Sequence, residues 1–318
     1  MAHYDVFNGD ADGICSLHQL RLEQPREATL VTGVKRDIAL LARVPAEAGG
    51  SVTALDISAD TNRAALEALL GRGVSVEYFD HHFAGELPRH PKLRALIDTS
   101  PGVCTGMIVD RYLGGRRRVW AVVAAFGDNL DAAAHDLARG LTLDGARLEA
   151  LRALGENIAY NAYGESESDL VAHPAELYRT VSRYADPFRL IAEEPLLERI
   201  DTARRGDLAR ARELEPQHRL ARAIVYVLPD EPWSRRVRGV FGNEVANRHP
   251  DLAHAILTQD ARGDYVVSVR APRTAPTGAD SLCRQFASGG GRAAAAGINH
   301  LPRDGLPEFV RCLGEAYG

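Results

Sequence analysis

Short apolar runs alternate with amphipathic segments along the first 130 residues or so. Three runs rich in β-branched residues predict buried strands, at His3–Phe7, Ser51–Leu55 and Val74–Phe79. Apolar residues recur at helical spacing in three segments between and after them, at Ile14–Leu22, Thr61–Leu70 and Val103–Leu113. This alternation is typical of βαβ units around a parallel sheet. The uniformly apolar run Trp120–Phe126 is compatible with either a strand or a buried helix.

The pattern changes beyond residue 130. Residues 132–215 are mostly helical in pattern and rich in charge, and a second α/β pattern begins near Ala221. Its predicted elements are strands at Ala223–Leu228, Ala253–Thr258 and Tyr265–Ala271, a helix opening at Val240–Asn247, a glycine-rich loop and a last helix at Pro307–Tyr317. We therefore predict a parallel-sheet α/β domain over residues 1–190, a helical linker over 191–220 and a smaller α/β domain over 221–318.

Composition narrows the classes of protein. The 318-residue chain is 45% hydrophobic and 25% charged, as in ordinary soluble proteins, and it carries a net charge of −5. That charge argues against coating long duplex nucleic acid, though not against a short anionic substrate. Arginine heavily outnumbers lysine, which we attribute to genomic base composition. The four scattered cysteines indicate buried reduced thiols, and the absence of a signal peptide or membrane-length apolar run predicts a cytoplasmic protein with no membrane partner.

Carboxylates and histidines gather directly after the predicted strands. Asp10 and Asp12 follow the first, Asp56 the second, and Asp80-His81-His82 the third, with Asp128 further along. Groups just past the carboxyl ends of parallel strands converge on one crevice. Carboxylates gathered there would repel one another, and divalent cations such as Mn²⁺ or Mg²⁺ would relieve that repulsion. The pattern therefore predicts a metal-dependent hydrolase.

Each cluster taken alone has a plainer explanation. Asp-x-Asp-Gly also makes ordinary turns, Asp56 could cap the following helix, and Asp128 by itself is better explained as a cap than as a ligand. Their ordered joint occurrence is what favours a metal site.

The ordered set resembles the DHH phosphoesterase superfamily, which includes RecJ-like exonucleases, small oligoribonucleases and bifunctional nanoRNA/3′-phosphoadenosine 5′-phosphate phosphatases. Near the end of the chain, three segments resemble the DHH-associated substrate-binding domain: Val267–Arg270, Ser288–Arg292 and Ala295–Gly297. Together the two resemblances cover nearly the whole chain.

The resemblance implies a site for two divalent ions, usually Mn²⁺, with Mg²⁺ as the alternative. Asp10 and Asp12 would hold one ion each, Asp56 would bridge them, and His81 and Asp128 would complete the shell of the second. His82 would lie near the scissile phosphate as a catalytic residue, with Asp80 orienting a histidine. A water activated in this way needs no Ser or Cys nucleophile.

The chain departs from the superfamily pattern in three positions. Val6 stands where many members have a histidine ligand, and Asn8 where RecJ-like members have an aspartate, so the first ion would be held more weakly. Arg292 replaces a common histidine and could clamp a phosphate by its planar fork. Gly289, Gly290 and Gly291 form either a flexible turn or a phosphate cradle. The predicted substrate-binding residues are Asn8, Arg270, Gly289, Gly290, Gly291, Arg292 and His300, the last being open between a loop role and a phosphate contact.

These inferences predict Mn²⁺-dependent hydrolysis of very short oligoribonucleotides or linear 5′-phosphorylated dinucleotides to mononucleotides. A 3′-phosphoadenosine 5′-phosphate phosphatase, a RecJ-like single-strand exonuclease and an inactive nucleotide-binding regulator remain alternatives. The sequence leaves the oligomeric state open, a dimer included.

Overall fold

The computed structural model describes residues 2–45, 49–260 and 262–318, and it divides into two compact units. The division falls between Thr202 and Ala203, within helix α9 (Pro195–Arg212). Each unit has its own sheet, in line with the α/β fold class predicted from the sequence. The domain limits 1–190, 191–220 and 221–318 stay a prediction.

The first unit is built on a five-stranded sheet whose hydrogen-bonded pairs are all parallel, in the order β2-β1-β3-β4-β5. Its strands are β1 (His3–Phe7), β2 (Thr29–Val31), β3 (Ser51–Leu55), β4 (Ser75–Asp80) and β5 (Leu93–Ile97). The three strands expected from the apolar runs are confirmed as β1, β3 and β4. They lie side by side, so the residues that follow them emerge at one edge of the sheet, as expected for parallel strands.

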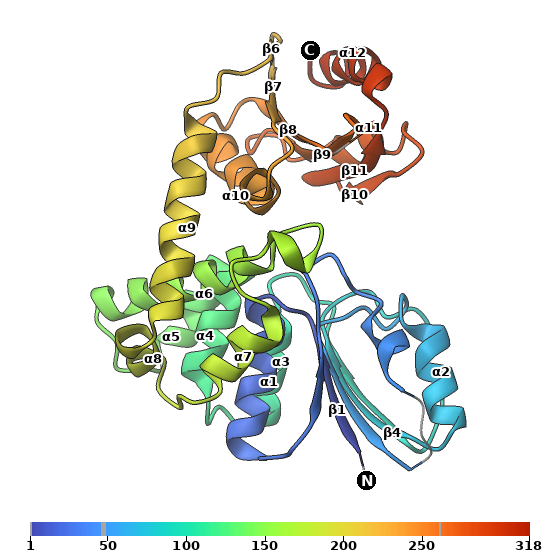
Figure 1. Ribbon diagram of the computed structural model, residues 1–318, viewed down its shortest axis with the longest axis vertical. Coiled ribbons are helices and arrows are strands. Elements are labelled where there is room, and N and C mark those ends of the chain that lie inside the picture. Colours follow the sequence, from blue (N-terminus) through green and yellow to red (C-terminus); the bar gives the residue numbers. More distant parts are fainter. Residues whose placement is uncertain (1, 46–48, 261) are drawn as a thin grey trace. The chain divides into compact units, whose positions relative to one another are not determined.

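Helices cover both faces of this sheet (Figure 1). One face packs against α2 (Arg63–Gly71) and the 3₁₀ turn η1 (Leu40–Arg43) around an apolar cluster that includes Val6, Tyr78 and Leu66. On the other side lie α1 (Ala11–Glu23), α3 (Thr105–Tyr112) and α4 (Arg118–Gly127). The remaining elements of the unit are α5 (Asp131–Ala138), α6 (Gly145–Ala162), η2 (Glu167–Asp169), α7 (Pro174–Val181), α8 (Pro187–Glu193) and the start of α9.

The apolar run Trp120–Phe126 forms most of helix α4. All seven of its residues are buried, because α4 packs against α1, α3 and α6 in the centre of the helical layer. A helix buried all round has no polar stripe, which is why periodicity could not distinguish it from a strand.

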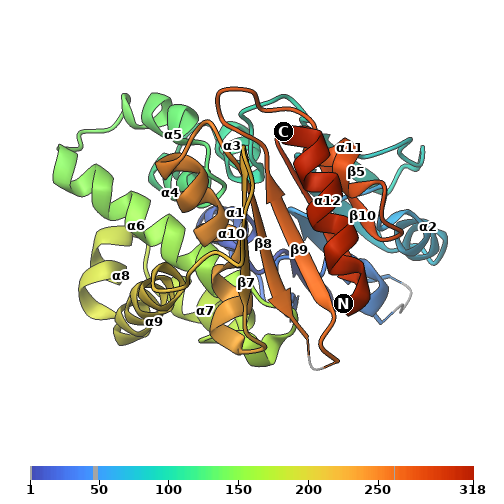
Figure 2. The same cartoon turned by 90° about the horizontal axis from the view of Figure 1, so that it is seen from above.

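The second unit contains a six-stranded mixed sheet in the order β10-β11-β9-β8-β7-β6, in which only β7 and β8 pair in parallel. Its strands are β6 (His218–Arg219), β7 (Ala223–Leu228), β8 (Ala253–Gln259), β9 (Tyr265–Arg270), β10 (Gly289–Arg292) and β11 (Ala295–Leu301). Its other elements are α10 (Pro232–Arg248), α11 (Ala279–Cys283), η3 (Arg303–Gly305) and α12 (Leu306–Tyr317). Helices α10 and α12 lie on opposite faces of this sheet (Figures 1 and 2).

Two expectations for this unit need correction. The glycine-rich segment is not a loop, because Gly289–Arg292 pairs with β11 as the edge strand β10. Helix α10 begins at Pro232, eight residues before Val240, since proline is well suited to the first turn of a helix.

All four cysteines are free and buried, as expected. None of the helices in the described parts of the chain is long and apolar enough to cross a membrane.

Candidate metal centre

Asp10 ends the turn after β1 and caps helix α1. Its Oδ1 accepts hydrogen bonds from the backbone N–H groups of Asp12 (3.0 Å) and Gly13 (3.1 Å), an N-cap arrangement. Its Oδ2 points elsewhere and accepts a hydrogen bond from Lys35 Nζ at 2.6 Å. One carboxylate oxygen therefore builds the helix start, and the other belongs to the site.

Asp12 lies in the first turn of α1 and faces the start of another helix. Its Oδ2 accepts the backbone N–H of Thr105 and its Oδ1 that of Gly106, both at 2.7 Å. The N-terminus of α3 carries unpaired N–H groups and a partial positive charge, so it favours the ionised form of this carboxylate. Neither Thr105 nor Gly106 was predicted from the sequence.

Asp56 follows β3 in an unusual backbone conformation. Its φ of 58° is in the left-handed region, which aspartate tolerates better than most residues, and its Oδ1 accepts a hydrogen bond from the Thr105 hydroxyl at 3.1 Å. It does not serve as the N-cap of α2, which begins after Asn62.

His81 stands at the centre of the acidic groups. Its Nδ1 lies 2.8 Å from the carbonyl oxygen of Val103, which fixes the ring and leaves Nε2 free to act as a ligand. Carboxylate oxygens surround that Nε2, at 3.5 Å from Asp56, 3.9 Å from Asp128 and 4.0 Å from Asp12.

Each of these separations from Nε2 is compatible with a shared divalent cation. Ligand atoms at about 2.0–2.2 Å from a common ion lie no more than about 4.4 Å apart, and the three distances from Nε2 meet this condition. Three carboxylates and one imidazole are a donor set suited to Mn²⁺ or Mg²⁺. Asp56, His81 and His82 offer ligand atoms that all lie within 4.8 Å of one another, and Asp12 and Asp128 each have a carboxylate oxygen within 4.0 Å of His81 Nε2. Residues of this group could hold such an ion.

Asp80 and His82 form a pair beside this group. Asp80, the last residue of β4, is fully buried, and its Oδ1 accepts a hydrogen bond of 2.7 Å from His82 Nδ1. Its Oδ2 is buried without a hydrogen-bond partner among the described residues. Burial opposes protonation of His82, but the hydrogen bond and charge of Asp80 outweigh it and raise the pKa of the imidazole.

The carboxylates nearest His81 are not fully compensated by positive charge. Burial and the neighbouring carboxylates Asp12 and Asp10 raise the pKa of Asp56 well above its usual range. Burial and the charge of Asp128 raise the pKa of Asp12 as well. Carboxyl groups in this position would be neutral at a higher pH than usual unless a cation bound among them, which supports the metal site predicted from the sequence.

Lys35 is the main site residue that was not predicted from the sequence. Its Nζ lies 2.6 Å from Asp10 Oδ2 and 3.4 Å from Asp128 Oδ1. Burial would raise the pKa of Asp10, yet the Lys35 ammonium brings it below the usual value. Lys35 follows the short strand β2, so it reaches the same sheet edge as the acidic residues.

Asn8 binds backbone groups of two site residues. Its Oδ1 accepts the N–H of Asp10 (3.2 Å), and its Nδ2 donates to the carbonyl of Lys35 (3.1 Å). Its predicted role in substrate binding remains a prediction.

Two predicted substrate-binding arginines stand in one row of the second unit's sheet. Arg270 on β9 is paired in register with Ala295 on β11, and Ala295 with Arg292 on β10. Directly opposed residues of antiparallel strands project to the same face, so both arginines and Ala295 share one face. Ser268, Gly297 and Gly290 form the adjacent row on that face. The surface between the arginines thus carries only small side chains.

Contacts within the unit orient Arg270. Its Nε donates to Asn243 Oδ1 at 2.7 Å, and its Nη1 donates to Ser268 Oγ at 2.9 Å. Gly289 has a packing role, because a Cβ there would lie 1.7 Å from the carbonyl oxygen of Cys283. His300 lies on β11, where its Nε2 is 3.8 Å from Asp264 Oδ2, and its contact with a phosphate remains a prediction.

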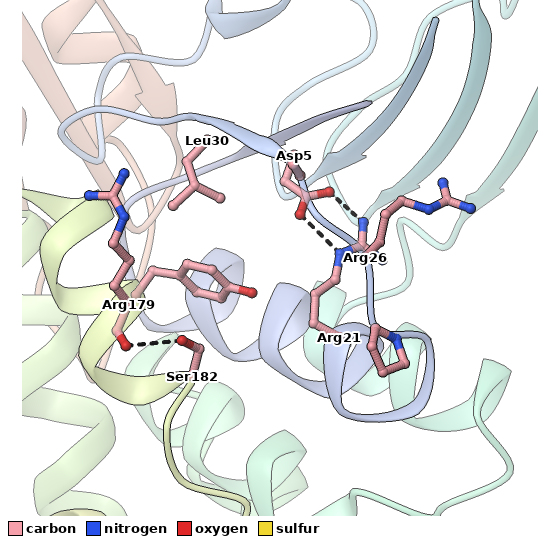
Figure 3. Close-up of a pocket in the computed structure, with 9 residues that line it drawn as sticks. Asp5, Arg21, Arg26, Leu30, Arg179 and Ser182 are labelled. Atoms are coloured by element: carbon pink, nitrogen blue, oxygen red, sulfur yellow. Dashed lines mark hydrogen bonds and ion pairs between the residues drawn. The ribbon is translucent and has the colours of Figure 1, made fainter. Parts of the chain in front are cut away.

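A separate cavity of about 350 Å³ lies among β1, α1 and α7 (Figure 3). Asp5 points from β1 to Arg21 of α1, whose Nε donates to Asp5 Oδ2 at 2.9 Å, and Arg179 and Ser182 line the far side. No residue of the acidic site lines it. The buried Asp5–Arg21 pair joins the sheet to α1 and so supports the helix that carries Asp12.

No protein-family model and no curated protein sequence matches the chain. Solved structures, in contrast, match the chain. A manganese-bound exonuclease RecJ shares 18% identity with a TM-score of 0.60, over 99% of this chain and 89% of RecJ. A pGpG-specific phosphodiesterase from Vibrio cholerae shares 14% identity with a TM-score of 0.58, over the full length of both chains.

A third structure, the DHH domain of a member of a family of ribosomal proteins, has a TM-score of 0.64 at 14% identity, over 99% of this chain and 86% of that one. At sequence identities of 14–18%, the structural similarity shows a shared fold and no more. The chain shares its fold with the RecJ exonuclease, with this DHH domain and with the pGpG-specific phosphodiesterase.

Proposed function

We propose that the protein is a divalent-metal-dependent phosphodiesterase acting on very short oligoribonucleotides or linear 5′-phosphorylated dinucleotides. One observation carries the proposal: His81 Nε2 lies within 4.0 Å of carboxylate oxygens from Asp12, Asp56 and Asp128. Mn²⁺ is the ion we propose, with Mg²⁺ as the alternative. The manganese bound to the RecJ structure and the pGpG specificity of the Vibrio cholerae structure are consistent with this choice.

A cation held by Asp12, Asp56, His81 and Asp128 would supply Lewis acidity toward water and a phosphoryl oxygen. The chain's own residues would do the rest. Thr105 and Gly106 hold Asp12 in place through their N–H groups, and Val103 orients His81 through its carbonyl. His82, half-buried and held by Asp80, could give a proton from Nε2 to the leaving oxygen.

Substrate binding would use the second unit. The planar guanidinium groups of Arg270 and Arg292 suit a terminal phosphate, and the small residues between them leave room for it. β10 is also an edge strand, so it has N–H groups that pair with no strand and can bind anions. The net charge of −5 and the low aromatic content of 6% favour a short substrate over a long strand bound by base stacking.

The test is turnover of a substrate panel with Mn²⁺, with Mg²⁺ and with chelator. The panel contains 5′-phosphorylated diribonucleotides of several base compositions, a longer oligoribonucleotide, single-stranded DNA and 3′-phosphoadenosine 5′-phosphate. We expect metal-dependent cleavage of dinucleotides with little activity on longer strands. Preference for DNA would favour an exonuclease, and preference for the last compound a monoesterase. Metal and nucleotide binding with no turnover would favour a regulator.

The variant Asp56→Asn tests the site itself. Asparagine tolerates the positive φ at this position and keeps the shape of the side chain, so the fold should survive while an anionic ligand is lost. We expect turnover to fall to background. Asp60→Ala, in the same loop but exposed, is the matched control and should retain activity. Near-normal turnover of Asp56→Asn would contradict the site.

A further inference from the structure

We propose that the acidic site binds a single divalent cation and that the Lys35 ammonium takes the place of the second cation that the superfamily resemblance implies. The proposal rests on the proposed function, because it concerns the composition of the same site. It is carried by the position of Lys35, by what holds it there, and by the residues that are missing around Asp10.

Lys35 Nζ occupies the acidic site on the Asp10 side. It lies 2.6 Å from Asp10 Oδ2 and 3.4 Å from Asp128 Oδ1, so it bridges two carboxylates as a cation would. The other oxygen of Asp10 already accepts two backbone N–H groups. Asp10 Oδ2 is thus the oxygen of this residue that could reach a metal, and the ammonium contacts it.

A divalent ion and an ammonium group on the same carboxylate oxygen would repel each other at short range. The group around His81 Nε2 does not have this conflict, because Lys35 contacts Asp10 and the Oδ1 of Asp128, whereas the Oδ2 of Asp128 faces His81. One cation at His81 and one ammonium at Asp10 can therefore share the site.

The backbone of Lys35 is fixed in two places. Its N–H donates to the carbonyl of Ala162 at 2.9 Å, and its own carbonyl accepts the Asn8 side-chain amide at 3.1 Å. If position 8 held an aspartate, as in RecJ-like members, its ionised carboxylate could not donate this hydrogen bond. The departure at Asn8 and the placement of Lys35 are thus two parts of one arrangement.

The part of the site around Asp10, where the resemblance places the first cation, also lacks ligands. Val6, at the position of the superfamily's histidine, is fully buried in the apolar cluster between the sheet and α2. Asn8 faces backbone groups. Asp10 and Asp56 alone remain of the residues expected to hold that ion.

Composition gives independent support. Among the 38 lysine and arginine residues of the chain, only Lys35 and Lys92 are lysines. One of the two lysines in this arginine-rich sequence, Lys35, lies in the acidic site. A compact ammonium with three donors can replace a metal ion among carboxylates, whereas a planar guanidinium cannot occupy the same volume.

The test is the Mn²⁺ stoichiometry of the full-length protein after chelator treatment, by isothermal titration and by electron paramagnetic resonance. We expect one equivalent and the spectrum of an isolated ion for the wild type. Lys35→Ala should take up a second equivalent and give the signal of a spin-coupled pair. Lys35→Met serves as a second variant: it keeps most of the side-chain length without the charge, so it should also take up a second equivalent.

The other lysine provides the matched control. Lys92 is far along the sequence and donates to the carbonyl of Gly73, so Lys92→Ala should behave as the wild type. Two equivalents in the wild type, or one in a folded Lys35→Ala protein, would overturn the inference and leave the proposed function intact. No bound Mn²⁺ in any protein would instead remove the proposed function.

Discussion

His82 Nδ1 donates a 2.7 Å hydrogen bond to Asp80 Oδ1, and the acceptor is fully buried at the end of β4. A carboxylate only accepts, so the imidazole carries its proton on Nδ1 and presents Nε2 to the site. The pair resembles other arrangements in which a buried carboxylate fixes the tautomer of a working histidine.

This relationship predicts the effect of Asp80→Asn. The amide oxygen can still accept the hydrogen bond, but the charge that favours the protonated ring is lost. We expect kcat to fall about 10–100-fold while the amount of bound Mn²⁺ stays unchanged. The same change in a His82→Ala background should have little further effect, because Asp80 acts through that ring. Fully multiplicative losses would show that Asp80 acts independently of His82.

A second prediction concerns the packing that carries Asp12. A Cβ on Gly106 would lie 2.5 Å from the Ala124 Cβ and 3.2 Å from Asp12 Oδ1. Gly106→Ala should therefore push α3 away from α4, lower the free energy of unfolding by about 1–3 kcal/mol and weaken Mn²⁺ binding. Thermal melts and titrations measure both effects.

Gly71→Ala is the matched control for that prediction. Gly71 is the last residue of α2, and a methyl group at its Cβ position would have no neighbour within 4 Å, so alanine should be neutral or slightly stabilising there. Equal stability of the two variants would show that the α3–α4 contact has room to adjust.

The sheet of the first unit could be predicted from the sequence because its signals are local. Apolar runs mark β1, β3 and β4, and parallel pairing brings the residues after each strand to one edge. Asp12, Asp56 and His81 could therefore be grouped without a structure, whereas Asp128 follows helix α4 and joined the group only through the ordered pattern. Only the ordered pattern made this possible, since each residue alone has a plainer explanation.

The parts that were missed depend on tertiary contacts. β2 has three residues and is half-exposed, so its apolar signal is weak, and Lys35 after it was overlooked. The start of α3 reaches Asp12 across 93 residues of sequence, which no local motif encodes. β10 consists of three glycines and an arginine, a composition that indicates a loop; pairing with β11 overrides it.

A third prediction addresses the arginine row of the second unit. Arg270→Ala and Arg292→Ala should each raise KM for a 5′-phosphorylated dinucleotide, about 10-fold or more, with a smaller change in kcat, because a phosphate contact shared by ground and transition states is lost. Arg311→Ala is the matched control, since Arg311 lies on α12, on the opposite face of the sheet, and pairs with Glu308 and Glu315. An unchanged KM for both row variants would place the terminal phosphate elsewhere.

The last prediction concerns stability at mildly acidic pH. His18 on α1 is buried, and its Nε2 lies 2.8 Å from the carbonyl oxygen of Tyr184. Its ring packs edge-on against Trp120, with the two ring centroids 4.4 Å apart. Burial lowers its pKa from 6.5 to about 4. The unfolded chain therefore takes up this proton near pH 6.5, whereas the folded chain resists until about pH 4.

The contribution of His18 to stability is consequently complete above pH 6.5 and declines as the pH falls toward 4, by about 3 kcal/mol in total. His18→Gln keeps a donor for the Tyr184 carbonyl and removes the titrating group, so its unfolding free energy should depend less steeply on pH over this interval. Denaturant unfolding at pH 7.5, 6, 5 and 4.5 measures the slope, with the partly exposed His90→Gln as control. Parallel slopes for His18→Gln and the wild type would mean that His18 takes up its proton in the folded protein as readily as in the unfolded chain.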